Sequence, residues 1–154
     1  MSSLNVIKTY IEDIFKTRRF AVLATEGDGQ PHASLVAVTP MAGFRELIFA
    51  TYRNTSKYSN LARNGRVAVL VECITTNRSD LQESLVLTAF GQAGEIKDGE
   101  ENILFEAHLE RHPELSDFMK SEDCSLVLIN VDTYQIVRGV DDVEWWKIDD
   151  LVQP

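Results

Sequence analysis

The spacing of apolar residues predicts a helix at the start of the chain. Between residues 4 and 16 the apolar positions recur every three or four residues, which places them on one helical face, and Ser3 is placed to cap the helix. These positions are Leu4, Ile7, Ile11, Ile14 and Phe15. We therefore expect an amphipathic helix that lies on the core.

Short apolar and β-branched runs predict strands over much of the remaining chain. The expected strands cover residues 20–25, 32–39, 46–51, 66–73, 84–96, 125–130, 134–138 and 143–148. A glycine-containing turn at 26–30 joins the first two, and Pro40 and Gly43 break the chain before the third, so we expect these three strands to form a meander. Gly91 and Gly94 interrupt the longest strand and predict a bend or bulge there.

Further helices are expected in two regions. One covers residues 55–64, with Asn54 or Thr55 as its cap. Another covers residues 98–111, capped by its first residue, and a short helix starts at Pro113. Many strands at short spacing, with few helical crossovers, favour a mainly β, α+β domain whose antiparallel sheet closes into a barrel.

Composition and charge narrow the class of protein. The chain has 154 residues, of which 44% are hydrophobic and 25% charged, and this fits one globular domain over residues 1–154. The net charge of −9 argues against nucleic acid and against an anionic membrane surface as partners. The longest apolar runs are too short to cross a bilayer, and no secretory signal pattern opens the chain, so we expect a cytoplasmic location.

The acidic residues are unevenly distributed. The segment from Leu47 to Val71 contains no Asp or Glu, although a chain with 24 acidic residues would place about four there. The same segment carries Arg53, Lys57 and two further arginines. An acidic protein that keeps one segment free of negative charge is suited to binding an anion there.

The segment Arg53-Asn54-Thr55-Ser56-Lys57 offers the groups that hold a phosphate. It stands where a predicted strand ends and a predicted helix begins, so backbone N–H groups and the positive end of the helix dipole would face an anion. Hydroxyl side chains add donors, and Arg53 and Lys57 add positive charge. A capped helix with two ordinary surface cations is the alternative interpretation of the same residues.

Five motifs in order and spacing resemble the pyridoxamine 5′-phosphate oxidase-like flavin-binding split barrels. The resemblance covers roughly residues 5–96, and the Thr-Ser-Lys-x-x-Asn-Leu stretch after a Phe-Ala-Thr strand is its most specific part. The motifs are Phe20-Ala-Val-Leu-Ala-Thr25, Gly29-Gln-Pro-His-Ala-Ser-Leu-Val36, Leu47-Ile-Phe-Ala-Thr51, Arg53-Asn-Thr-Ser-Lys-Tyr-Ser-Asn-Leu61 and Arg66-Val-Ala-Val-Leu70. The resemblance implies a six-stranded antiparallel Greek-key split barrel with flanking helices, and a homodimer that holds FMN at the subunit interface.

The resemblance also implies which residues contact the cofactor. The flavin ring would lie against Ser34, Leu35, Val36 and Ala37, with Ala50 and Thr51 on the neighbouring strand. The phosphate would be held by Arg53, Thr55, Ser56 and Lys57. The second subunit would contribute Asn77, Arg78, Ser79, Gln82 and Trp146. The family often has arginine at the position of Ser56, so Arg53 and Lys57 carry more of the expected charge here.

The resemblance favours an FMN-dependent oxidoreductase that acts on an unknown small molecule, and no catalytic residue is assigned. The chain lacks the Arg-x-His motif with which true pyridoxamine phosphate oxidases bind their substrate near the C-terminus. One alternative is a non-catalytic flavin-binding module for storage or sensing. Another is a split barrel that uses a deazaflavin or haem, for which His32 is the only histidine in the barrel half.

Two histidines are candidates for a metal site. His108 and His112 stand four residues apart on the helix expected at 98–111, a spacing that can bind zinc. However, Leu109 stands where a His-Glu-x-x-His motif has its glutamate. We therefore expect these histidines on a solvated helix face and assign no metal.

Overall fold

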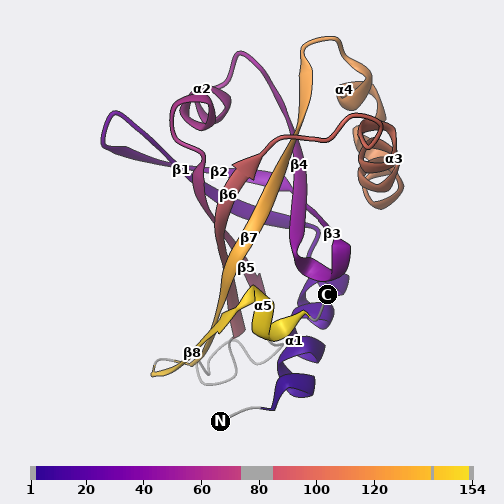
Figure 1. The fold of residues 1–154 in the computed structure, drawn as a ribbon. Helices are drawn as coiled ribbons and strands as arrows, with labels where there is room; N and C mark the ends of the chain where they lie inside the picture. The colour runs from indigo at the N-terminus through magenta and orange to yellow at the C-terminus, as the bar shows by residue number, and fades with distance from the viewer. Residues whose placement is uncertain (1–2, 74–84, 140, 153–154) are drawn as a thin grey trace.

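The computed structural model describes residues 3–73, 85–139 and 141–152. Within them, one antiparallel sheet curls into a half-barrel with helices on its flanks, which confirms the expected split-barrel, α+β architecture (Figure 1). The strands are β1 (Phe20–Gly27), β2 (Gln30–Ala37), β3 (Thr39–Met41), β4 (Glu46–Tyr52), β5 (Arg66–Cys73), β6 (Leu85–Gly94), β7 (Cys124–Arg138) and β8 (Asp142–Lys147). The helices are α1 (Leu4–Thr17), α2 (Ser56–Arg63), α3 (Glu101–Arg111), α4 (Ser116–Lys120) and α5 (Ile148–Leu151), with single turns η1 (Ala42–Phe44) and η3 (Pro113–Leu115).

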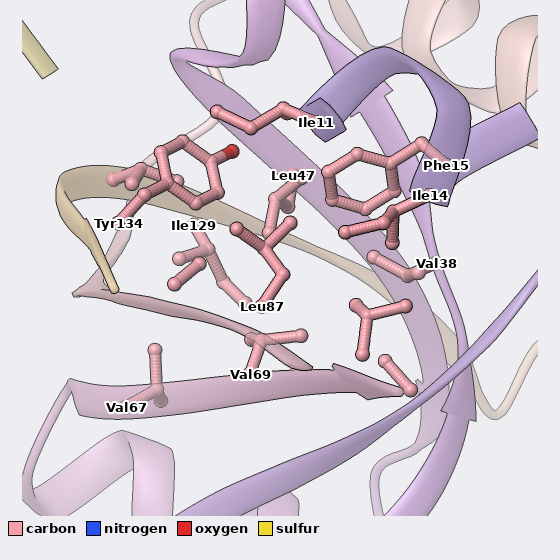
Figure 2. Packing of buried hydrophobic residues seen from close by; sticks show 14 of the residues in the cluster. Ile11, Ile14, Phe15, Val38, Leu47, Val67, Val69, Leu87, Ile129 and Tyr134 are labelled. Atoms are coloured by element: carbon pink, nitrogen blue, oxygen red, sulfur yellow. The ribbon is translucent and has the colours of Figure 1, made fainter. Parts of the chain in front are cut away.

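Helix α1 covers the core of the half-barrel as expected. Ser3 caps the helix, because its Oγ accepts a hydrogen bond from the backbone N–H of Val6 at 3.4 Å. Figure 2 shows Ile11, Ile14 and Phe15 of this helix lying over apolar side chains of the strands. The apolar spacing that predicts the helix is therefore the surface that closes the core.

The β1–β2 hairpin has the tight turn that its sequence indicates. Pairing runs from Phe20 opposite Ala37 down to Gly27 opposite Gln30, which leaves two residues in the turn. Both have positive φ, at 52° for Asp28 and 83° for Gly29, and Asp-Gly is a favoured pair for such turns because glycine tolerates this conformation.

The expected meander of the first three strands is wrong. The sheet order is β2-β1-β5-β6-β7-β4-β3, so β4 pairs with β7 and not with β2. Strand β3 doubles back onto the first residues of β4, with Thr39 opposite Ile48. The chain therefore leaves β2, turns through η1 and enters a different part of the sheet, which proximity in sequence cannot predict.

The expectation of two separate strands at residues 125–130 and 134–138 is also wrong, because β7 is continuous. Phe90 of β6 lies opposite Thr133 and Gly91 opposite Val131, so Asp132 between them has no partner on β6. This is the bulge expected at Gly91, and the extra residue belongs to β7. Asp132 instead forms a salt bridge with Arg66 at 2.9 Å.

Two smaller expectations about the helices have different outcomes. Helix α3 begins at Glu101, and its N-cap position is Glu100, which makes no capping hydrogen bond with its side chain, so the expected cap at Asp98 is wrong. Pro113 opens the turn η3 that leads into α4, as expected for a residue that lacks an N–H group.

The close approach of β6 and β7 at the bulge predicts that Gly91→Ala destabilises the fold. A Cβ atom at Gly91 would lie 2.2 Å from the backbone oxygen of Asn130, and backbone cannot yield as a side chain can. We expect the free energy of unfolding to fall by about 1–3 kcal/mol, measured by urea unfolding. Gly65→Ala is the control, since the nearest atoms to a Cβ there are 3.4 Å away. Equal losses in both variants would contradict this explanation.

Candidate functional site

The junction between β4 and α2 is fixed by two threonine hydroxyl groups. Thr55 caps α2, because its Oγ1 accepts from the N–H of Tyr58 at 3.3 Å and donates to the carbonyl of Tyr52 at 2.9 Å. The hydroxyl of Thr51 lies 3.0 Å from that of Thr55. The junction therefore holds the first turn of α2 in a set position at the end of β4, and the expected cap at Thr55 is confirmed.

A groove of about 250 Å³ opens beside this junction. It gathers seven of the residues that the sequence assigns to a cofactor, drawn from β2, β4 and the start of α2. The lining residues are Phe20, Leu35, Val36, Ala37, Ala50, Thr51, Tyr52, Thr55, Lys57, Leu115 and Phe118. Among these described lining residues, Lys57 is the only one with a charged side chain. The groove surface that they form therefore carries no acidic group, as the acid-free segment of the sequence predicts.

The groove runs along the open seam of the half-barrel. Strand β2 ends the sheet on one side and pairs only with β1 among the described strands. On the other side β3 pairs with β4 only as far as Ile48, so the part of β4 from Phe49 to Tyr52 has β7 as its one described pairing partner. Both edges therefore present backbone N–H and C=O groups that no described strand uses.

Aromatic and aliphatic side chains form the walls of the groove. Tyr52 and Phe118 meet edge to face, with ring centroids 4.7 Å apart. Leu35 and Phe20 stay 69% and 48% exposed, so two large apolar side chains stand at the opening of the groove. The groove thus has an apolar body and a polar end at Thr55 and Lys57.

Sequence reasoning missed four of the lining residues. Phe20 and Tyr52 are the first residue of β1 and the last of β4, and an aromatic residue at the end of a strand is the signal that could have found them. Leu115 and Phe118 come from η3 and α4, which Figure 1 shows beside β4 and β7. No local pattern links that acidic segment to a groove.

The remaining cofactor candidates lie elsewhere or outside the described residues. Ser34 faces the barrel interior opposite Leu23, and its hydroxyl is buried without a hydrogen-bond partner among the described residues. Ser56 is the exposed first residue of α2, and Trp146 on β8 packs against the main core. The candidates whose placement is not described are Asn77, Arg78, Ser79 and Gln82.

Arg53 points away from the groove. Its guanidinium donates to the backbone carbonyl of Glu122, and its own N–H donates to the carbonyl of Asp123 at 3.0 Å. It lines a neighbouring polar hollow of about 280 Å³ together with Cys124 and Ser125. Of the two cations at the junction, Lys57 lines the groove of the same chain and Arg53 does not.

The expectation that His108 and His112 are solvated is wrong, since both side chains are wholly buried. His108 Nδ1 lies 2.8 Å from Thr39 Oγ1, and His112 Nε2 donates to the carbonyl of Val38 at 2.9 Å. Burial lowers the pKa of His108 to about 4, and burial also lowers the pKa of His112. Among the described residues, no group of three or more potential ligands is placed to hold a metal ion.

Comparison with known proteins gives the family. The sequence matches the family model described as pyridoxamine 5′-phosphate oxidase over residues 7–137. A comparison with curated protein sequences gave no match. No helix among the described residues has the length and apolarity needed to span a membrane.

Several solved structures share the fold at low sequence identity. The heme binding protein from Mycobacterium smegmatis superposes with a TM-score of 0.84 at 19% identity, over 98% of this chain and 60% of that one. General Stress Protein 26 from Bacillus anthracis gives 0.70 at 21% identity, over 92% and 98%. A FAD-binding protein from Mesorhizobium loti gives 0.68 at 17% identity, over 88% and 94%.

This chain spans only 60% of the length of the mycobacterial protein, so the likeness there is to one part of a longer chain. The family match, by contrast, includes every strand from β1 to β6 and both edges of the seam. With the half-barrel, the seam groove and the match over residues 7–137 in agreement, the chain belongs to the pyridoxamine 5′-phosphate oxidase family.

Proposed function

We propose that the chain binds FMN in the seam groove and acts as an FMN-dependent oxidoreductase on a small molecule. The observation that carries this proposal is the groove itself, which has two free strand edges along its length and a capped helix start with Lys57 at its end. A flat heteroaromatic ring with a phosphate tail matches that arrangement. The flavin would supply the redox chemistry, and the protein would hold and orient it.

The polar end of the groove is suited to the phosphate. The backbone N–H groups of Ser56 and Lys57 lie in the first turn of α2, where no intrahelical acceptor exists for them. The helix dipole, the hydroxyl of Thr55 and the ammonium group of Lys57 all favour an anion at the same point. The described residues that line the groove include no carboxylate that would repel this anion.

The body of the groove is suited to the flavin ring. Its pyrimidine edge carries both donors and acceptors, which the free backbone groups of β2 around Val36 could pair with, much as an added strand would. The apolar side chains of Leu35, Ala37 and Ala50 offer contact area for the rest of the ring. Ser34, which the resemblance assigned to the ring, lies behind this surface.

The similar structures support a flavin but include a haem binder. One neighbour is described as a FAD-binding protein and another as a heme binding protein. The described residues that line this groove include no histidine, and the side chains of His108 and His112 are wholly buried. The groove therefore favours the flavin, because a haem iron usually takes an axial protein ligand.

A homodimer forms part of the proposal. A groove of about 250 Å³ is smaller than the ordinary cofactor pocket of roughly 300–1,000 Å³, so a second surface is needed to cover the ring. Leu35, Val22 and Leu70 lie opposite one another on β2, β1 and β5 and form an exposed aliphatic row that starts at the groove. A second copy of the chain on this row would bury it and close the groove.

Activity separates an enzyme from a flavin-storing or flavin-sensing module. The chain loaded with FMN should oxidise NADH or NADPH in the presence of an electron acceptor, which is followed as loss of absorbance of the reduced nicotinamide. Binding of FMN with no turnover across a panel of reductants and acceptors would favour the non-catalytic alternative. The absorption spectrum of the purified protein distinguishes a flavin from a deazaflavin or haem.

The position of Lys57 predicts that Lys57→Glu weakens FMN binding but not riboflavin binding. Riboflavin lacks the phosphate, so the charge reversal should raise the dissociation constant for FMN by about 10- to 100-fold and leave that for riboflavin nearly unchanged. Flavin fluorescence titration measures both constants. Arg63→Glu is the matched control, because Arg63 is also on α2 but pairs with Asp28 at 2.8 Å and does not line the groove.

The same titrations test the site as a whole. Failure of the folded wild-type chain to bind FMN would overturn the proposal. Equal loss of FMN affinity in Lys57→Glu and Arg63→Glu would place the phosphate elsewhere. Arg53→Ala tests the second cation of the junction. The sequence predicts that Arg53 holds the phosphate, whereas its guanidinium in this structure contacts the carbonyl of Glu122.

The aliphatic row predicts that Leu70→Glu produces a monomer. A carboxylate buried without a partner in this row would be costly, whereas Leu70 contributes nothing to the groove lining. We expect light scattering to give the mass of a dimer for the wild type and of a monomer for the variant, with weaker FMN binding. Ile103→Glu is the control, because Ile103 is 63% exposed on α3, away from the row. A wild-type monomer that binds FMN tightly would contradict the dimer.

A further inference from the structure

A buried histidine pair fastens the outer wall of the groove to the barrel. The rings of His108 and His112 lie 4.8 Å apart between α3 and the segment that joins β2 to β3. His108 contacts Thr39 and His112 contacts Val38, so both rings hold the end of α3 against the barrel. Each ring keeps one buried nitrogen, His108 Nε2 and His112 Nδ1, without a hydrogen-bond partner among the described residues.

The neighbouring Arg111 strengthens the same attachment. Its Nε donates to the carbonyl of Val38 at 2.9 Å, and its NH2 donates to the carbonyls of Phe15 and Arg18 at the end of α1. The last turn of α3 is thus joined to both α1 and the β2–β3 connection. These hydrogen bonds are part-buried or exposed, and they lie next to the two buried rings.

The wall of the groove that η3 and α4 form begins next to His112 in the chain. The carbonyl of His112 accepts a hydrogen bond from the N–H of Leu115 at 3.0 Å, and the ring of His112 lies 6.2 Å from that of Phe20. Leu115 and Phe20 both line the groove, and Phe118 follows one turn later. Release of the last turn of α3 would therefore carry one wall of the groove away from the barrel.

The charges around the pair oppose a proton on either ring. Arg111 lies on the same helix, and Arg19, which precedes β1, faces His112 and forms a salt bridge with Glu114 at 3.3 Å. Among the described residues, Glu114 is the one acidic group that acts on both rings, and its Oε1 is 3.9 Å from His112 Nδ1. Two cations and a single, half-exposed carboxylate surround the pair, so protonation of both rings would bury uncompensated charge.

We propose that His108 and His112 act as positioning residues whose protonation detaches the η3–α4 wall and releases the bound cofactor in acid. This inference rests on the proposed FMN site for its ligand, but the movement of the wall does not require FMN. The neutral pair holds the η3–α4 wall against the barrel, and the doubly charged pair favours a form in which both rings reach water.

The direction of the pH dependence follows from burial. A histidine in water has a pKa near 6.5, whereas burial holds the pKa of His108 at about 4 and also lowers that of His112. Between these pH values the detached form takes up more protons than the attached form, in which the wall lies against the barrel. The attached form is therefore fully favoured above pH 6.5 and loses stability as the pH falls toward 4.

The test uses a variant that keeps the hydrogen bonds and removes the titration. In His112→Gln the amide nitrogen can replace Nε2 as the donor to Val38, and in His108→Asn the side-chain amide can replace Nδ1 beside Thr39. His32→Gln is the control, since it removes the third histidine, which does not line the groove. If the double variant His108→Asn/His112→Gln folds poorly, His108→Asn alone serves, because burial lowers the pKa of His108 to about 4.

Hydrogen–deuterium exchange of the FMN-free chain reports on the wall alone. After correction for the intrinsic effect of pH, exchange over residues 112–120 should rise about tenfold or more between pH 7 and pH 4.5 in the wild type and in His32→Gln. It should change less than about threefold in the double variant. Equal acid-induced exchange in the wild type and the double variant would overturn the proposal.

Titration with FMN at the same pH values reports on release. We expect the dissociation constant of the wild type to rise about tenfold more than that of the double variant, and the proton taken up by the phosphate of FMN affects both alike. A histidine-dependent change in exchange without this difference would overturn the link to the cofactor. A histidine-dependent change in exchange with no FMN binding at any pH would support the movable wall and reject the proposed function.

Discussion

The unpaired seam of the half-barrel is the constraint on which the remaining structure depends. Strand β3 begins at Thr39 and occupies the edge of β4 only as far as Ile48, and β2 does not pair with β4 among the described strands, so the sheet stays open between them. Each edge keeps backbone groups that must find partners in water, in a ligand or in another chain. The groove, the apolar residues beside it and the capped start of α2 are all gathered along this one opening.

Much of this arrangement follows from local sequence. The apolar spacing of α1, the Asp-Gly turn and the cap at Thr55 depend on residues a few positions apart, and each has the predicted form. The cofactor candidates from β2 and β4 also meet in one groove. Here the family resemblance supplied what local patterns lack, namely that two strands separated in sequence share an opening. The acid-free segment added an independent reason to expect an anion at the end of that opening.

The parts that sequence reasoning missed depend on contacts between distant segments. The pairing of β4 with β7, and the wall that Leu115 and Phe118 add, join residues from opposite halves of the chain. The buried state of His108 has the same origin, because a helix rich in acidic residues gives no sign that one face carries imidazoles toward Thr39. Arg53 shows the converse, since its sequence neighbours suggest a phosphate ligand and its guanidinium contacts the chain at Glu122.

The pairing of β4 with β7 has a consequence for how the protein matures. One wall of the seam groove stands on β4 and another follows α3, so the groove has no counterpart in a chain that has formed only its first hairpin or its first helix. Contacts between distant segments are slow to form, because the intervening chain must lose its freedom first. A ligand that needs every wall cannot guide the early steps of folding. It can bind only molecules that have already completed the fold, and it stabilises those molecules by mass action.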